Sequence, residues 1–145
     1  MEQVHATCVA IDNTGILLRG SPRAGKSDLA MRLIDGGAQL VADDRVDLRM
    51  EGDSLIAAAP PALAGLLEVR GLGIIRLDAL PQAHIGLVVD LVGAEIIERL
   101  PIPESTQLLD TVLPLLHLAP FEASAPAKVR LAAGLVAGRI MRADD

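Results

Sequence analysis

Residues 16–35 read ILLRGSPRAGKSDLAMRLID, and the glycine-rich centre of this stretch decides how the rest of the chain is interpreted. Residues 20–27 fit the pattern G-x-x-x-x-G-K-[ST]. The apolar run Ile16–Arg19 before it predicts a strand. Apolar residues spaced by three and four after it predict a helix from Lys26 to about Asp35. A strand, a glycine-rich loop and a helix in this order are typical of a phosphate-binding loop.

Each part of this loop has a chemical reason. Glycines let backbone N–H groups turn towards phosphate oxygens, and the start of the helix adds the positive end of its dipole. Lys26 is expected to neutralise the β- and γ-phosphates of ATP, and the Ser27 hydroxyl to bind Mg²⁺. From the residues alone, Arg23 is interpreted as a solvated side chain. The candidate nucleotide-binding residues are Gly20, Ser21, Pro22, Arg23, Ala24, Gly25, Lys26 and Ser27.

A magnesium nucleotide site also needs a carboxylate at the end of a neighbouring apolar strand. Asp43 and Asp44 follow the short run Gln39–Ala42, and Asp90 follows an apolar run that begins at His84. The pair is favoured over Asp90, because one carboxylate can hold the metal while the other takes a proton from an attacking hydroxyl. Asp90 is interpreted as structural or remote.

Two other groups of polar residues give weaker signals. Glu68 and Arg70 stand two residues apart and so project from one side of an extended segment. Without further information we interpret them as a surface ion pair. The three histidines His5, His84 and His117 lack metal-ligand spacing, so each is interpreted as a packed or solvated side chain.

Composition limits the class of protein. The chain has 145 residues, of which 51% are hydrophobic and 22% charged, and its formal net charge is −6. This size and balance predict one globular domain over residues 1–145, and the acidity argues against nucleic-acid binding. No apolar run is long enough to cross a membrane. One cysteine, Cys8, fits a reducing compartment, so we expect a cytoplasmic protein.

The remaining pattern predicts many short strands and few helices. Strands are expected at 5–11, 39–42, 66–69, 84–92 and 111–118, with a hairpin formed by 46–50 and 54–59, and a closing helix at 127–141. Residues 70–73 are too rich in glycine for a regular element. This pattern indicates an α/β protein with a mixed, strand-rich sheet.

Five segments in this order resemble the catalytic domain of the HPr kinase/phosphorylase family. They are VHAT at 4–7, GSPRAGKSDLA at 20–30, LVADDRV at 40–46, EVRGLGII at 68–75 and ERL at 98–100. The resemblance runs from about Val4 to Thr111 and starts at the catalytic domain, as in a short form of the family. It implies a fold like that of phosphoenolpyruvate carboxykinases and assembly into a homo-oligomer, commonly a hexamer.

The resemblance also implies an activity and site residues. Members use ATP and Mg²⁺ to phosphorylate a seryl hydroxyl of HPr, the phosphocarrier protein of the sugar phosphotransferase system, and many reverse the reaction with inorganic phosphate. It assigns catalytic roles to His5, Lys26, Asp44 and Arg99, with Asp44 as the base. It assigns magnesium binding to Ser27 and Glu68, and we expect Asp43 to take part as well.

Two departures from the family pattern bear on function. Pro22 and Arg23 stand where the family usually has Ser and Gly, and residues 119–124 lack the arginine of the family segment tied to dephosphorylation. The kinase direction is therefore favoured over phosphorolysis. Two alternatives stay open: a small-molecule kinase on the same scaffold, and a nucleotide-binding regulatory module without transfer activity.

Overall fold

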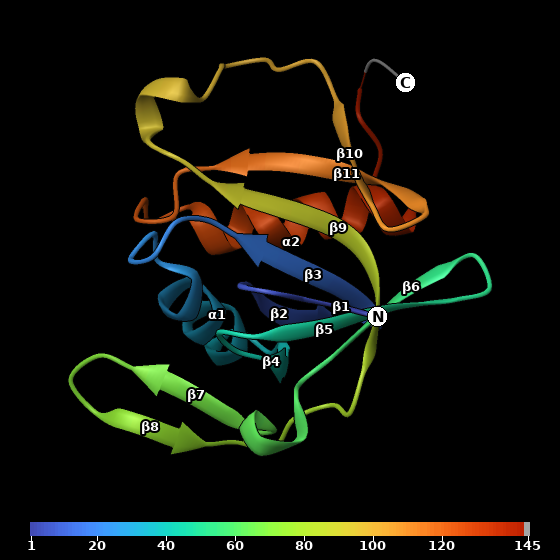
Figure 1. Cartoon of the computed structure of the whole chain (residues 1–145). Coiled ribbons are helices and arrows are strands. Elements are labelled where there is room, and N and C mark those ends of the chain that lie inside the picture. The colour runs from blue at the N-terminus through green and yellow to red at the C-terminus, as the bar shows by residue number, and fades with distance from the viewer. Residues whose placement is uncertain (144–145) are drawn as a thin grey trace.

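The computed structural model describes residues 1–143 and contains eleven strands, two α-helices and two short 3₁₀ helices (Figure 1). In chain order these are β1 (Glu2–Val4), β2 (Thr7–Ile11), β3 (Thr14–Arg19), α1 (Lys26–Asp35), β4 (Gln39–Ala42), β5 (Val46–Glu51), β6 (Ser54–Ala58), η1 (Pro61–Leu63), β7 (Leu66–Val69), β8 (Gly73–Arg76), β9 (Ala83–Leu91), η2 (Ala94–Ile96), β10 (Glu104–Leu108), β11 (Thr111–Leu118) and α2 (Ala125–Ala137).

Nine strands form one mixed sheet, as the strand-rich α/β prediction required. Its order is β1-β5-β6-β9-β3-β2-β4, and β11 continues from the later half of β9 with β10 outside it. β3 pairs in parallel with β9, and β9 in parallel with β11. β4 is also parallel to these strands, because β2 pairs antiparallel with both β3 and β4. The carboxyl ends of β3, β4, β9 and β11 therefore lie at one edge of the sheet.

Alternation along the central strands divides the core into two clusters. Ile16 and Leu18 of β3 face a cluster that contains the buried side chains of α1 and α2, so both helices cover one face (Figure 1). Leu17 of the same strand faces a second cluster, built with Val46 and Leu55 of the β5–β6 hairpin. Aliphatic residues thus fill both sides of β3 and fix the position of the loop that follows it.

A separate two-stranded hairpin, β7–β8, lies beside α1 (Figure 1). Leu67 is fully buried in the cluster on the helix side, whereas Leu72 and Ile74 near the tip are exposed. The backbone N–H of Leu77 donates to the carbonyl of Gly65 at 2.7 Å and closes the base of the hairpin. The hairpin is therefore anchored at one end and free to line a site with its turn.

The predicted secondary structure differs from the observed one at several places. Of the strand predicted at 5–11, only Thr7–Ile11 is extended, as β2; the chain bends at His5, and the unpredicted strand β1 lies before the bend, at Glu2–Val4. The segment 70–73 is the turn of a hairpin, and β8 begins at its last glycine; neither β8 nor β10 was predicted. The closing helix runs from Ala125 to Ala137 rather than over 127–141, because Gly138 adopts φ 75° and ends it with a left-handed cap.

Across residues 1–143, no helix combines the length and apolar character needed to span a bilayer.

Candidate functional site

The glycine-rich loop connects the end of β3 to the first turn of α1. The N–H of Ala24 donates to the Ser21 carbonyl at 3.0 Å, and Arg23 and Gly25 adopt φ of 69° and 100°. Positive φ is easy for glycine and uncommon for arginine. The two left-handed residues curl the loop around the N-terminus of α1, where the first N–H groups of the helix have no partner within it.

Lys26 lies across this loop. Its Nζ donates hydrogen bonds to the carbonyl oxygens of Gly20, at 2.8 Å, and Ser21, at 3.1 Å. A Cβ on Gly20 would lie 2.8 Å from the Ala24 side chain and 3.3 Å from that of Leu91, so the backbone is closely packed there. The ammonium group is thus held at the mouth of the loop, beside the N-terminus of the helix.

Asp43, at the end of β4, joins three elements through one carboxylate. Oδ1 accepts hydrogen bonds from the hydroxyls of Thr7, at 2.9 Å, and Ser27, at 2.7 Å. Oδ2 accepts from the backbone N–H of Glu68 at 3.1 Å. The side chain is buried, and its hydrogen bonds connect β2, the start of α1 and the β7–β8 hairpin. The prediction that Asp43 is itself a magnesium ligand stays a prediction.

Asp44 differs from Asp43 in the exposure of its side chain and in its backbone conformation. Its side chain is 72% exposed and lines the cavity described below. Its φ of 71° turns the chain sharply, and the Arg45 N–H donates to the Asp43 carbonyl at 2.8 Å. Because aspartate tolerates this left-handed conformation, the turn can point one carboxylate into the protein and the next one outward.

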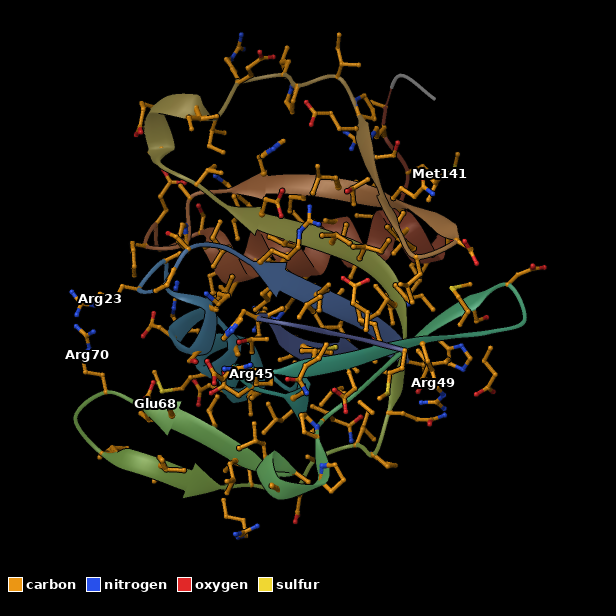
Figure 2. All side chains as sticks on the ribbon, in the orientation of Figure 1. Arg23, Arg45, Arg49, Glu68, Arg70 and Met141 are labelled. Carbon is orange, nitrogen blue, oxygen red and sulfur yellow. The ribbon has the colours of Figure 1, made fainter. Side chains whose placement is uncertain are left out.

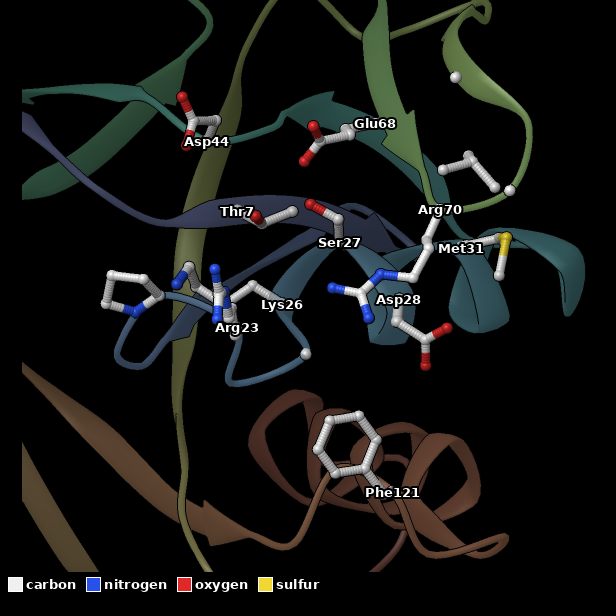
Figure 3. A pocket seen from close by; sticks show the side chains of 15 residues that line it. Thr7, Arg23, Lys26, Ser27, Asp28, Met31, Asp44, Glu68, Arg70 and Phe121 are labelled. Carbon is white, nitrogen blue, oxygen red and sulfur yellow. The ribbon is translucent and has the colours of Figure 1, made fainter.

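A cavity of about 640 Å³ lies between the loop, the start of α1 and the β7–β8 hairpin (Figure 3). Its walls carry charges of both signs and one aromatic ring. Figure 3 shows Glu68, Ser27, Thr7 and Asp44 on one side of the loop and Phe121 on the other. The lining residues are Thr7, Pro22, Arg23, Gly25, Lys26, Ser27, Asp28, Met31, Asp44, Glu68, Val69, Arg70, Gly71, Gly73 and Phe121.

Three cations line this cavity although the protein as a whole is acidic. They are Arg23, Lys26 and Arg70, and the guanidinium groups of Arg23 and Arg70 lie near each other at the cavity mouth (Figures 2 and 3). Arg23, Glu68 and Arg70 all line the cavity and all are exposed, so the interpretation of Arg23 as a solvated side chain stays a prediction. The ion pair interpreted between Glu68 and Arg70 is not among the salt bridges within residues 1–143. Such a cluster of cations is suited to polyanions, because arginine and lysine donate charge-assisted hydrogen bonds to phosphate oxygens.

Oxygen donors suited to Mg²⁺ lie at the acidic side of the cavity. Within residues 1–143, no three His, Cys, Asp or Glu side chains are grouped so that they could hold a metal ion on their own. Mg²⁺ usually keeps several waters and binds through one or two carboxylates together with substrate phosphates. Two hard oxygen groups fit this mode of binding: the Glu68 carboxylate and the Ser27 hydroxyl, which donates a hydrogen bond to Asp43.

Several residues considered from the sequence lie outside the lining of this cavity: Gly20, Ser21 and Ala24 of the loop, the buried Asp43, and also His5, Asp90 and Arg99. His5 is exposed in the bend between β1 and β2, and Arg99 is exposed in the segment that follows η2. Their catalytic assignments stay predictions. Asp90 forms a two-pronged pair with Arg19, at 2.7 and 3.0 Å, which agrees with its interpretation as structural.

Phe121 is the lining residue that the sequence analysis did not assign to the site. It is the only Phe, Trp or Tyr of the chain, it follows β11, and the residue is 71% exposed. A Cβ added to Gly25 would lie 2.9 Å from its ring. The signal in the sequence was a lone aromatic residue just past the strand predicted at 111–118.

Comparison with known proteins gives one consistent result. The family model described as HPr Serine kinase C-terminal domain matches residues 1–118. An HPr kinase/phosphorylase of Geobacillus kaustophilus is 40% identical over 127 residues, which are 79% of this chain and 41% of that protein. One of Geobacillus thermodenitrificans is 43% identical over 96 residues, 61% of this chain and 31% of that protein. The matched regions thus span less than half the length of these relatives.

A solved structure shares the fold over almost the whole chain. It is the Hpr(Ser) kinase/phosphatase from Coxiella burnetii, with a TM-score of 0.85 and 27% sequence identity. The alignment covers 96% of this chain and 98% of that one. The mixed sheet with its two helices is therefore the fold of that protein, as the resemblance implied.

Proposed function

The chain belongs to the HPr serine kinase C-terminal domain family, and on this premise we propose that it is a kinase that uses ATP and Mg²⁺ to phosphorylate a seryl hydroxyl of the phosphocarrier protein HPr. The proposal takes residues 1–145 as one catalytic domain. It assigns loop 20–27 to the nucleotide, Ser27 and Glu68 to the metal with Asp43 as a further metal residue, and Asp44 to the acceptor serine.

The observation that carries the proposal is the division of labour between Asp43 and Asp44. Asp43 is buried and accepts three hydrogen bonds, so it fixes Ser27 and the Glu68 backbone in place. Asp44 is exposed in the cavity and makes one long ion pair, 3.8 Å, with Arg45. One carboxylate thus supports the metal and phosphate groups, while the next one is accessible to a protein substrate.

The residues around the cavity support an in-line transfer. Lys26, Arg23 and Arg70 provide positive charge for the triphosphate, and the N-terminus of α1 adds backbone donors. Magnesium, when bound with ATP, would neutralise charge on the β- and γ-phosphates. Asp44 accepts the proton of the attacking serine hydroxyl, whose oxygen forms the new bond to the γ-phosphorus as the bond to ADP breaks.

Residues 119–124 bear on the direction of the reaction. This segment contains Phe121 and Glu122 and no arginine. An arginine could hold inorganic phosphate as a nucleophile, and its absence from this segment supports the transfer from ATP to serine over the reverse phosphorolysis. We therefore propose the kinase direction as the main activity and phosphorolysis as the weaker one.

The proposal includes a cytoplasmic location and a homo-oligomer, hexameric as the family resemblance implies. The single cysteine is buried and free, which fits a reducing compartment. Leu100, Ile102 and Val112 are large apolar side chains that are at least 64% exposed, and they follow β9 or lie on β11 near the edge of the sheet. Such side chains support contacts between subunits.

The test incubates the purified chain with γ-labelled ATP, Mg²⁺ and HPr from the same organism. We expect label on one HPr serine, loss of label when the metal is chelated, and loss in the Lys26→Ala and Asp44→Asn variants. Asp44→Asn should still bind ATP, because Asp44 is proposed to act on the serine rather than on the nucleotide. The catalytic roles assigned to His5 and Arg99 are tested in the same assay with the His5→Ala and Arg99→Ala variants.

Other outcomes favour the alternatives. Label on a metabolite in the absence of HPr would favour a small-molecule kinase on the same scaffold. ATP binding without any transfer, in the presence of HPr and Mg²⁺, would favour a nucleotide-binding regulatory module.

A further inference from the structure

The position of Phe121 is fixed by the residues on both sides of it. Ala119 and Pro120 are buried, and the N–H of Glu122 donates to the Ala119 carbonyl. The Arg32 guanidinium on α1 donates to the Pro120 carbonyl and also pairs with Asp28, at 3.0 Å. The segment after β11 is thus attached to the helix that follows the glycine-rich loop, while Phe121 stays 71% exposed.

The ring lies on the opposite side of the loop from the acidic groups. β4, which leads into Asp43 and Asp44, stands on one side of β3 with β2 between them. β11, which leads into Phe121, stands on the other side with β9 between them. All four parallel strands end at the same edge, so the loop after β3 separates the two groups (Figure 3). Ligands of open sheets bind at such an edge.

This arrangement gives a bound nucleotide a direction. The terminal phosphate must face Asp44 and Glu68, because the transfer of the proposed function takes place there. The phosphates run along the loop, past Lys26 and the N-terminus of α1, and the nucleoside then leaves on the other side. There the cavity wall is the Phe121 ring, within 3.0 Å of where a Gly25 Cβ would stand.

We propose that Phe121 is a nucleotide-specificity residue, whose ring stacks on the base of the bound ATP. An exposed aromatic ring on a polar cavity wall offers a flat apolar surface, and every base has a flat face to cover it. The inference rests on the proposed function only in that a nucleotide binds at loop 20–27. Stacking depends on the area of the base and not on hydrogen bonds to its edges. Purine nucleotides, whose bases are larger, should therefore bind more tightly than pyrimidine nucleotides.

The first test measures the contribution of the base to affinity separately from that of the phosphates. Calorimetry measures the affinity for Mg-ATP and for magnesium tripolyphosphate, which has the phosphate chain and no base. We expect Phe121→Ala to weaken ATP binding by roughly 5- to 100-fold and tripolyphosphate binding by less than about twofold, as for loss of one stacked base. Phe121→Leu, which keeps the apolar contact with the loop but has no flat ring, should resemble Phe121→Ala.

Leu131→Ala is the matched control, because Leu131 is also a largely exposed apolar residue and lies outside the lining of this cavity. It should change neither affinity. Equal ATP affinities of the wild type and Phe121→Ala would overturn the inference. An equal loss for ATP and tripolyphosphate would also overturn it, since the ring would then support the loop rather than the base.

A second variant gives an optical readout. The chain has no tryptophan or tyrosine, so Phe121→Trp introduces its only indole. We expect quenching of the indole emission by ATP and GTP, and none by tripolyphosphate. No quenching by ATP at concentrations that saturate the site would contradict stacking.

The outcomes also separate this inference from the proposed function. Phe121-dependent ATP binding without label on HPr would keep the inference and overturn the kinase proposal. Labelled HPr together with a Phe121→Ala variant of unchanged ATP affinity would do the opposite. A chain that binds no ATP would overturn both.

Discussion

The hydroxyl of Ser27 donates a hydrogen bond of 2.7 Å to Oδ1 of Asp43, across 16 positions of sequence. This bond ties the first turn of α1 to the end of β4, and the hydroxyl of Thr7 on β2 donates to the same carboxylate oxygen. Asp43 is thereby a support for the site, and its neighbour Asp44 is free to face the cavity.

The first prediction compares these adjacent carboxylates by the same substitution. Asp43→Asn should lower the free energy of unfolding by about 1–3 kcal/mol, because all three partners of Asp43 are donors and the new NH₂ group faces one of them. Asp44→Asn should stay within about 0.5 kcal/mol of the wild type, since Asp44 is exposed and asparagine tolerates its positive φ.

Phosphate transfer should depend strongly on Asp44, although stability does not. Asp44→Asn should lower the rate of transfer to HPr by about 10²- to 10⁴-fold, as for loss of a general base. Denaturant unfolding and the labelled-ATP assay measure the two effects. Loss of stability in Asp44→Asn comparable to that in Asp43→Asn would contradict this division of roles.

The second prediction concerns Gly25. Its φ of 100° strains any residue with a Cβ, and the Phe121 ring would have to move aside. Gly25→Ala should lower the unfolding free energy by about 1–2 kcal/mol and greatly weaken ATP binding. Gly37→Ala is the matched control, because Gly37 has φ 110° with open space around its Cβ position.

Both glycine variants should lose a similar amount of stability, and only Gly25→Ala should lose nucleotide affinity. Thermal unfolding and calorimetry with Mg-ATP measure these quantities. Full ATP affinity in Gly25→Ala would show that the loop is not the phosphate site.

The third prediction concerns the Arg19–Asp90 pair at the ends of the parallel strands β3 and β9. Its two hydrogen bonds are 2.7 and 3.0 Å long, and the side chains are 30% and 27% exposed. Asp90→Ala should lower the unfolding free energy by about 1–2 kcal/mol, after allowance for solvent screening. Phosphate transfer per folded molecule should not change.

The matched pair is Arg49 with Glu51, a single contact of 3.1 Å with a glutamate that is 60% exposed. Glu51→Ala should change stability by less than about 0.5 kcal/mol. A large loss of transfer activity in Asp90→Ala would mean that Asp90, and not the Asp43–Asp44 pair, serves the reaction.

The fourth prediction concerns the only thiol. Burial in the sheet raises the pKa of Cys8 from 9.0 to about 12, because the thiolate would lose its hydration there. The folded protein should therefore resist iodoacetamide at pH 9, whereas the unfolded chain should react. Between pH 9 and 12 the unfolded state releases the thiol proton first, so this group lowers stability as pH rises, by up to about 1.4 kcal/mol per pH unit.

Cys8→Ala removes this contribution and should show a shallower fall of stability above pH 9 than the wild type. Denaturant unfolding between pH 8 and 10.5 measures both slopes. Identical slopes, or fast labelling of the folded wild type, would contradict the buried and neutral thiol.

The sequence by itself determined the elements whose signals are local. The loop 20–27 with its flanking strand and helix, and the β5–β6 hairpin, follow from short-range patterns of glycine and apolar residues. β8 and β10 were missed, because each is paired only with one neighbouring strand and its residues are largely exposed, so neither has a clear apolar pattern. Gly138 ended α2 earlier than its apolar run indicated.

Tertiary structure decided which residues share the site. Asp43 and Asp44 are adjacent in sequence, and only the left-handed turn at Asp44 shows that one is buried and the other faces the cavity. Phe121 reaches the loop because β11 is parallel to β3 in the same sheet, and no local signal encodes that alignment. Strands that are distant in sequence pair with one another, and the register of each strand depends on its neighbours. The residues that form the site therefore follow from the whole sheet rather than from any one motif.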